Sequence, residues 1–173
     1  AIPKHIETGA SNPSTNSYKR LVPGFEAPVS ICFGIANRTA VIRIPGYADA
    51  PDTRRFEFRP SDGTCNPYIA YSALLMAGID GIVKGIDPAK EGFGPMDVNV
   101  FELPENERMR IGSLPKSLEE ALHALESDNE YLQQGGVFSS AFIERWISNK
   151  YENEVLKVMP SPTPQEFELY FDV

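Results

Sequence analysis

Arginine side chains that could bind anions are concentrated in the first third of the sequence. They are Arg38, Arg43, Arg55 and Arg59, with one carboxylate, Glu57, between the last two. Four guanidinium groups in one region repel one another unless anions lie between them, and each can grip phosphate or carboxylate oxygens with two parallel hydrogen bonds. A lone carboxylate among them could ligate a divalent metal ion. The pattern indicates a polyphosphate or carboxylate site, and a solvated charged surface is the alternative that it leaves open.

Three segments with the periodicity of β-strands carry these residues. Residues 29–36 alternate bulky and small side chains, residues 39–45 are β-rich and end at Pro45-Gly46, and residues 54–59 alternate aromatic with charged side chains. Because successive side chains of a strand point to opposite faces, Arg55, Glu57 and Arg59 share one face of the last strand. Phe56 and Phe58 occupy the other face and require a cover.

The rest of the sequence is predominantly helical in pattern. Residues 68–83 follow the cap signal Asn66-Pro67 and are apolar nearly all round, which predicts a buried helix. Ser117 and Glu120 form a capping-box pattern before an apolar stripe, and residues 140–156 form a longer amphipathic helix. Three prolines in residues 159–173 predict a tail that leaves the body extended. Strands first and helices afterwards indicate the α+β class.

Composition limits the classes of partner. The 173 residues carry a net charge of −8, which argues against nucleic-acid binding through bulk charge. No apolar run approaches the roughly 20 residues of a membrane helix, and no signal-peptide pattern opens the sequence. Two cysteines are too few for a disulfide scaffold, so a reducing, cytoplasmic setting is expected. The irregular first 27 residues indicate a cut through a larger chain.

The order of several motifs resembles the glutamine synthetase family, in its bacterial and archaeal class I type. Residues 12–28 read NPSTNSYKRLVPGFEAP, which is similar to the loop around the glutamate site of these enzymes. The segments NRTAVIRIP (37–45), RFEFR (55–59), NPY (66–68), LLMAGIDGI (74–82) and EFELYFDV (166–173) follow in the family's order. The resemblance covers nearly the whole chain.

The resemblance implies a fold and a division of the chain. Residues 1–173 would be the carboxy-terminal portion of the α+β catalytic domain, which is of the glutamine synthetase and guanido kinase type, with antiparallel strands first and then mostly helices. Residues 1–60 would supply the flap loop and the active-site strands, and residues 61–158 the helical part. Residues 159–173 would form a carboxy-terminal arm.

The resemblance also implies an activity and a role for each site residue. The parent enzyme, an ATP-dependent glutamate–ammonia ligase, would make L-glutamine from L-glutamate, ammonia and ATP through γ-glutamyl phosphate. Arg20 and Arg59 would bind glutamate, and Glu26 would take the proton from ammonium and shield the intermediate. The remaining assignments are Arg38 to the phosphoryl group in flight, Arg43 and Arg55 to the ATP phosphates, and Glu57 to a metal ion.

Cofactors and partners follow from the same resemblance. Mg²⁺ or Mn²⁺ would accompany ATP as co-substrate, and the full-length cytoplasmic enzyme would be a dodecamer of two hexameric rings, with no nucleic-acid or membrane partner. The isolated chain is expected to be inactive, because the family's other metal and glutamate ligands are absent; His5, in a loose terminus, and His123, on an ordinary helix, do not replace them. Asp52 stands where many relatives have Lys, and Phe101 stands where bacterial relatives carry an adenylylated Tyr.

Three alternatives remain open from the sequence. The first is a γ-glutamyl-polyamine ligase of the same superfamily, which joins glutamate to a larger amine. The second is a non-catalytic assembly protein built on this fold. The third is a simple anion-binding α+β module, against which the long first motif argues.

Overall fold

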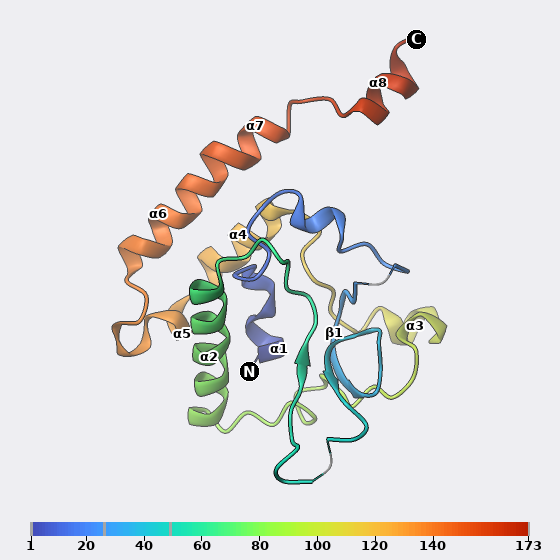
Figure 1. The fold of residues 1–173 in the computed structure, drawn as a ribbon, viewed down its shortest axis with the longest axis vertical. Coiled ribbons are helices and arrows are strands. Elements are labelled where there is room, and N and C mark those ends of the chain that lie inside the picture. Colours follow the sequence, from blue (N-terminus) through green and yellow to red (C-terminus); the bar gives the residue numbers. More distant parts are fainter. Residues whose placement is uncertain (1, 26, 49, 173) are drawn as a thin grey trace.

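The fold is a small sheet with α1 (Ile2–His5), α2 (Pro67–Val83) and α4 (Leu118–Ser127) on one side of it, the short α3 (Glu105–Arg108) on the other and a helical rod across the top (Figure 1). The computed structural model describes residues 2–25, 27–48 and 50–172. The strands are β1 (Ser30–Ile35), β2 (Ala40–Ile44) and β3 (Glu57–Phe58), in the order β1-β2-β3.

The other α-helices are α5 (Glu130–Gln133), α6 (Ser140–Lys150), α7 (Leu156–Val158) and α8 (Pro164–Tyr170). Short 3₁₀ turns are η1 (Ile6–Thr8), η2 (Ser17–Lys19), η3 (Val100–Glu102) and η4 (Gln134–Gly136), and η5 (Tyr151–Val155) is a π-helical turn. The α+β prediction is confirmed.

The sheet is mixed, and the expectation of antiparallel strands holds for one of its two pairs. β2 and β3 are antiparallel, with Arg43 opposite Glu57, whereas β1 and β2 are parallel. Closeness in sequence favours a hairpin, because parallel neighbours usually need a crossover of about a dozen residues. Here Ala36 takes a left-handed conformation, with φ 56°, and the Asn37 amide donates to the carbonyl oxygens of Met96 and Val98 at 2.6 and 2.8 Å. These bonds hold the connection against the neighbouring segment, so it does not reverse as a hairpin.

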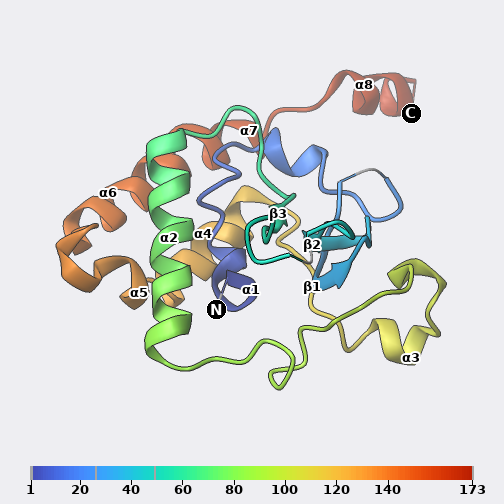
Figure 2. The same cartoon turned by 60° about the horizontal axis from the view of Figure 1, so that its bottom comes forward.

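Helix α2 begins as predicted but is only half buried. Asn66 caps it by accepting hydrogen bonds from the backbone N–H groups of residues 68 and 69, and Pro67 is the first helical residue. The face formed by residues 73, 76, 77 and 80 is buried, and α1 lies between α2 and the strands (Figure 2). The opposite face exposes Tyr68, Tyr71, Leu75 and Ile82 by 64–83%. The prediction of a fully buried helix is therefore wrong for this chain, because α1 and α5 cover one face.

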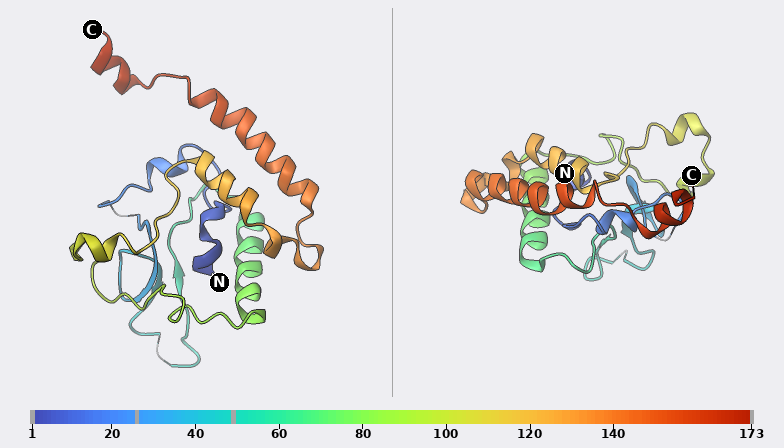
Figure 3. Two further views of the ribbon diagram at one scale, coloured as in Figure 1. Left: turned by 180° about the vertical axis from the view of Figure 1, so that it is seen from behind. Right: turned by 90° about the horizontal axis from the view of Figure 1, so that it is seen from above.

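The second half of the chain forms the core with the sheet and then leaves it. Ser117 caps α4, whose buried Leu118, Ala121 and Leu122 pack with Val41 of β2. The helix predicted over residues 140–156 is confirmed as α6, η5 and α7 in succession. Figure 3 shows this rod on the outside of the body, with α8 beyond it. No helix in the described ranges is long and apolar enough to cross a membrane.

The tail differs from the extended arm expected from its prolines. The helical rod does end before Pro160, but residues 164–170 form the new helix α8. Thr163 and Glu166 make a reciprocal capping box, and Pro164 occupies the first turn, where its missing N–H is no loss. Phe167, Leu169, Tyr170 and Phe171 remain 55–77% exposed.

Candidate functional site

A cleft of about 690 Å³ opens beside β2 and β3 and brings together three of the predicted arginines. Its lining is Gly24, Phe25, Pro28, Arg38, Thr39, Arg43, Arg59 and Phe101. Sequence reasoning did not place Phe101 here, because it lies more than 40 residues from the arginines in the chain. The lining combines fixed positive charge with two aromatic side chains, which suits an anionic ligand that also carries an organic part.

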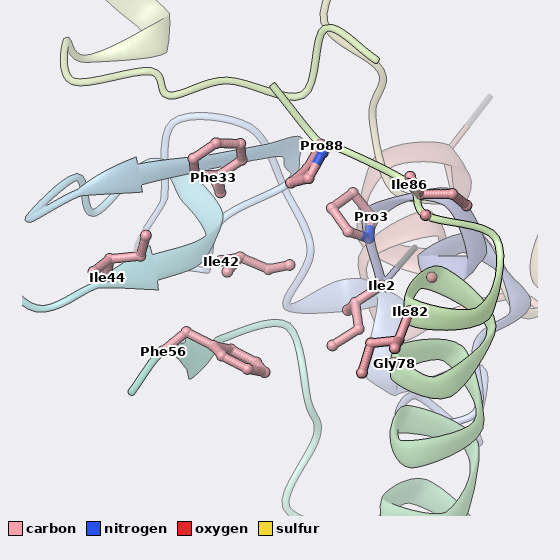
Figure 4. A pocket seen from close by; sticks show the side chains of 12 residues that line it. Ile2, Pro3, Phe33, Ile42, Ile44, Phe56, Gly78, Ile82, Ile86 and Pro88 are labelled. Atoms are coloured by element: carbon pink, nitrogen blue, oxygen red, sulfur yellow. The ribbon is translucent and has the colours of Figure 1, made fainter. Parts of the chain in front are cut away.

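The strand alternation separates this charged face from an apolar one. Arg43 lines the cleft, whereas its neighbours Ile42 and Ile44 line a second hollow of about 440 Å³ on the other side. Figure 4 shows Phe33, Phe56 and Ile82 around that hollow, between the strands and α2. All of its lining residues are apolar, so it offers no charged group for chemistry. The predicted division of the strand into an aromatic and a charged face is confirmed for Phe56.

Arg43 and Glu57 form an ion pair across the strands. Arg43 Nη1 lies 3.5 Å from Glu57 Oε2, and the two side chains are 26% and 40% exposed. The Nε atom of Arg43 is buried and has no hydrogen-bond partner among the described residues. The alternative of a fully solvated charged surface therefore does not fit Arg43, whose Nε–H group is buried and has no partner among the described residues.

Arg38 and Arg59 meet at the start of β2. The Arg59 Nη1 group donates to the carbonyl oxygen of Arg38, and that of Ala40 lies 3.5 Å away. Arg59 is half-buried, and Arg38 is exposed in the wall of the cleft. The Arg59 guanidinium is thus anchored on the backbone that carries Arg38, next to the start of β2.

Arg20 lies beside the end of the charged strand instead of in the cleft wall. Its Nη2 group donates to the carbonyl oxygens of Pro60 and Ser61 at 2.6 and 2.8 Å. The nearby Asp62 interacts with the same loop. Its carboxyl group accepts a hydrogen bond from Ser17 and lies near the charge of Arg20, and both interactions lower its pKa. The loop of residues 11–20 is thus attached to the segment that follows Arg59.

Two further predicted residues lie outside the cleft lining. The guanidinium of Arg55 stands over the ring of Tyr47, with 4.8 Å from its central carbon to the ring centre. Glu26 lies outside the described residues. The structure therefore brings Arg38, Arg43 and Arg59 to one cleft and pairs Glu57 with Arg43, whereas Arg20 and Arg55 do not line the cleft.

A divalent metal ion does not fit the donor set of this chain alone. Glu57 offers one carboxylate, and it is shared with Arg43. In residues 2–25, 27–48 and 50–172, no group of three or more His, Cys, Asp or Glu side chains could hold a metal ion. Since Mg²⁺ needs several oxygen ligands, the Glu57 assignment requires donors from elsewhere.

His5 corrects the sequence interpretation, which placed it in a loose terminus. It is only 4% exposed; its Nε2 lies 3.0 Å from Asp80 Oδ2 and its Nδ1 2.5 Å from Asp128 Oδ2. Its ring stacks on Tyr131 with 3.9 Å between centroids. The partners are 75 and 123 residues away, so no local pattern announces the contact. His123 is exposed on α4, as predicted, 3.8 Å from Glu126.

Buried Asp80 is the centre of this network. Lys84 Nζ lies 2.7 Å from its Oδ1, to which Gln134 donates at 3.1 Å. Burial raises the pKa of Asp80, but hydrogen bonds from Lys84 and His5 and their charges outweigh it and lower the pKa to about 2. The network joins α1, α2, the end of α4 and the start of η4, and none of its residues lines the cleft.

Comparisons with known proteins identify what this chain resembles. The family profile described as the catalytic domain of glutamine synthetase matches residues 6–170. A glutamine synthetase of Streptomyces filamentosus is 50% identical over 163 residues, which are 94% of this chain and 34% of that protein. The chain therefore spans about a third of the length of this curated relative.

Solved structures agree with the sequence comparison. A complex of GmaS with ADP aligns with a TM-score of 0.77 and 30% identity, over 99% of this chain and 38% of the other. A glutamine synthetase of Plasmodium falciparum aligns with a TM-score of 0.80 and 26% identity, over 98% of this chain and 40% of the other.

Proposed function

Because this chain belongs to the glutamine synthetase family, we propose that the protein containing it makes L-glutamine from L-glutamate, ammonia and ATP. The observation that carries the proposal is the meeting of Arg38, Arg43 and Arg59 at one cleft, within a region that matches the family over residues 6–170. This chain would be the carboxy-terminal portion of the catalytic domain. Residues 1–60 would supply the flap loop and the site strands, 61–158 the helical part and 159–173 the arm.

The chemistry explains why the cleft is rich in arginine. ATP first phosphorylates the γ-carboxylate of glutamate, which brings anions together, and ammonia then displaces phosphate from γ-glutamyl phosphate. Fixed cations offset the charge that develops in the first step. In the proposal Arg38 faces the transferring phosphoryl group, and Arg43 and Arg55 hold the nucleotide phosphates. The ADP bound by the similar protein GmaS supports the nucleotide part.

The glutamate side of the site would involve three residues. Arg59 and Arg20 bind glutamate and its phosphorylated intermediate in the proposal; Arg20 now donates to the carbonyl oxygens of Pro60 and Ser61, so it would exchange these bonds for the ligand. Glu26 would accept the proton from ammonium and help to close the site against water, which would otherwise hydrolyse the intermediate.

The remaining requirements lie beyond this chain's own residues. Mg²⁺ or Mn²⁺ would be bound by Glu57 only together with ligands from other parts of the protein. We also propose a cytoplasmic dodecamer of two hexameric rings. The exposed apolar side chains of the arm support this proposal, because they could be buried against another subunit.

The proposal is tested with the full-length protein. Purified enzyme is given glutamate, ATP and Mg²⁺ with either ammonium or putrescine, and the amide product and released phosphate are measured. We expect glutamine with ammonium and little product with putrescine. Preferential use of putrescine would replace the proposed function by that of a γ-glutamyl-polyamine ligase. Neither product at any amine concentration would rule out catalysis and favour an assembly role.

A further inference from the structure

An aromatic side chain faces an arginine that lies two residues before Glu57 and outside the lining of the cleft. Tyr47 is 59% exposed, and the central guanidinium carbon of Arg55 lies 4.8 Å from its ring centre. A ring attracts a cation through its negative face within roughly 6 Å. An aromatic ring with more than half of its surface in water contributes little to a core, so the contact with Arg55 is the feature that needs explanation.

The turn that carries Tyr47 is held in place at both ends. Pro45 at its start is fully buried, and its carbonyl oxygen accepts a hydrogen bond from the N–H of Ala48 at 2.9 Å. Thr53 at its end donates through Oγ1 to the carbonyl oxygen of Ala50 at 3.1 Å and to that of Tyr47 at 3.5 Å. Tyr47 therefore projects from an anchored turn, and its ring has a defined place relative to the strands.

We propose that Tyr47 is a positioning residue that holds the Arg55 guanidinium ready for the phosphates of the nucleotide, an inference that rests on the proposed function. Arg55 precedes Glu57 by two residues and continues the row of charged residues that ends at Arg59. A ring attracts the cation through its face and uses none of the guanidinium N–H donors in a hydrogen bond, so these remain available to an oxyanion.

The benefit of such a contact is preorganisation. A free arginine side chain loses many rotamers when it binds an anion, and a residue that restricts it beforehand reduces that loss. An exposed cation–π pair has a strength that corresponds to about a two- to fivefold change in an equilibrium constant. Tyr47 should accordingly affect nucleotide affinity by that factor while it leaves the glutamate side of the site unchanged.

The test uses the full-length enzyme with four variants: Tyr47→Leu, Tyr47→Phe, Arg55→Ala, and Tyr47→Leu combined with Arg55→Ala. Binding of ADP is measured by calorimetry, and kcat and the KM values for ATP and glutamate are measured in the glutamine-forming assay. We expect Tyr47→Leu to weaken ADP binding and raise the KM for ATP about two- to fivefold, with kcat and the KM for glutamate unchanged. Tyr47→Phe keeps the ring and should restore the wild-type affinity. In the Arg55→Ala background, Tyr47→Leu should have no further effect.

Three results would overturn the inference. The first is a Tyr47→Leu variant with wild-type nucleotide affinity. The second is an equal loss of affinity in the presence and absence of Arg55, which would mean that the ring contacts the nucleotide directly. The third is a parallel rise in the KM for glutamate, which would mean a general disturbance of the turn. Failure of the proposed function looks different, because the wild-type protein would then form no glutamine from ammonium, whatever the relative affinities of the Tyr47 variants for ADP.

Discussion

At the scale of single residues, the cleft is built from charges that contact one another before any ligand binds. Arg43 and Glu57 form a half-exposed pair, and Arg59 donates to the backbone oxygen of Arg38. Such partly exposed ion pairs contribute little to folding stability, typically about 0–1 kcal/mol. Their value therefore lies in orientation, since they restrain the Arg43 and Arg59 side chains in the wall of a cleft of about 690 Å³.

Replacing Arg38 by Ala tests the proposed transition-state role. The full-length enzyme should lose about two to three orders of magnitude in kcat, because a charge aimed at the transferring phosphoryl group is removed. Steady-state assays of glutamine formation measure this loss, with Arg108→Ala as the control, because Arg108 is an exposed arginine on α3 that does not line the cleft. Turnover equal to that of the control would show that Arg38 is not part of the chemistry.

The Asp80 network predicts a dependence of stability on pH. The pKa of Asp80 falls from 3.8 to about 2 on folding. The contribution of Asp80 to the free energy of unfolding is therefore fully present above pH 4 and is lost as the pH falls toward 2. The shift corresponds to about 2 kcal/mol of unfolding free energy. Urea unfolding of the chain between pH 6 and pH 2, followed by the fluorescence of Trp146, measures it.

The matched comparison separates this network from general acid unfolding. Asp80→Asn should lower stability at neutral pH and flatten the pH dependence between pH 4 and pH 2. Asp87→Asn, at an exposed carboxylate with an ion-pair distance of 4.0 Å to Lys90, should keep the wild-type slope. Equal slopes in the wild type and in Asp80→Asn would contradict the pKa shift.

At the scale of elements, the site depends on how closely β1 packs against the segment 93–97. The N–H of Phe33 donates to the carbonyl oxygen of Phe93, and the carbonyl oxygen of Phe33 accepts from the N–H of Met96, both at 2.8 Å. The N–H of Ile35 donates to the Asp97 carboxylate, also at 2.8 Å. This segment covers the outer edge of β1, while Asn37 fixes the start of the connection to β2. The strand that carries Arg43 therefore takes its position from contacts made 60 residues later in the chain.

Gly34 is the point of closest approach in this arrangement. A Cβ atom there would lie 2.1 Å from the carbonyl oxygen of Met96, which the backbone cannot avoid without moving. Gly34→Ala should therefore cost about 1–3 kcal/mol or more in stability. Gly63→Ala is the control, because a Cβ there meets no atom within 4 Å, and its effect should stay within about 0.5 kcal/mol. Urea unfolding of both variants decides, and equal midpoints would refute the close packing.

At the scale of the whole molecule, two apolar surfaces stand out. One is the outer face of α2, which exposes Tyr68, Tyr71, Leu75 and Ile82, and the other is α8 with Phe167, Leu169, Tyr170 and Phe171. Large contiguous apolar surfaces usually mark contacts with other parts of an assembly. The chain spans about a third of its curated relative, so both surfaces are available for the remainder of the protein or for neighbouring subunits.

Removal of residues 160–173 from the full-length enzyme tests the arm. Burying its four large side chains in another subunit could contribute roughly 6–12 kcal/mol per arm before entropy costs. We expect the truncated enzyme to sediment as single hexameric rings or smaller species instead of a dodecamer. Substitution of Phe167 and Phe171 by Ser in the intact chain should act in the same direction. A double ring that persists after deletion would exclude the arm as the tether.

The isolated chain should form no glutamine. Its described residues provide no cluster of metal ligands, and the groups of a transition-state site lose most of their effect when only part of them is present. A purified polypeptide of residues 1–173 is assayed with glutamate, ammonium, ATP and Mg²⁺ beside the full-length enzyme. Glutamine formation by the short polypeptide that depends on ATP and Mg²⁺ would show that the cleft residues suffice.

Local chemistry in the sequence determined where the main helices begin and which charged residues share a face of the site, although the strand predicted over residues 54–59 is confirmed only for Glu57–Phe58. Asn66 and Ser117 cap the helices they were expected to cap, and Arg43 and Glu57 share a face of their strands. These features depend on residues within a few positions of one another, through strand periodicity and the hydrogen-bonding needs of helix ends. They can therefore be predicted from the sequence alone.

Contacts between distant segments decided the rest. The parallel pairing of β1 and β2 depends on hydrogen bonds from Asn37 to residues 96 and 98, and the burial of His5 depends on Asp80 and Asp128. The position of the Arg55 guanidinium over the Tyr47 ring depends on a turn closed by Thr53. Thr163 and Glu166 form a capping box that begins α8, so residues 164–170 are helical although the prolines predicted an extended tail. Pairing, burial and the orientation of a charged side chain depend on which surfaces meet, and the fold determines that by packing the chain as a whole.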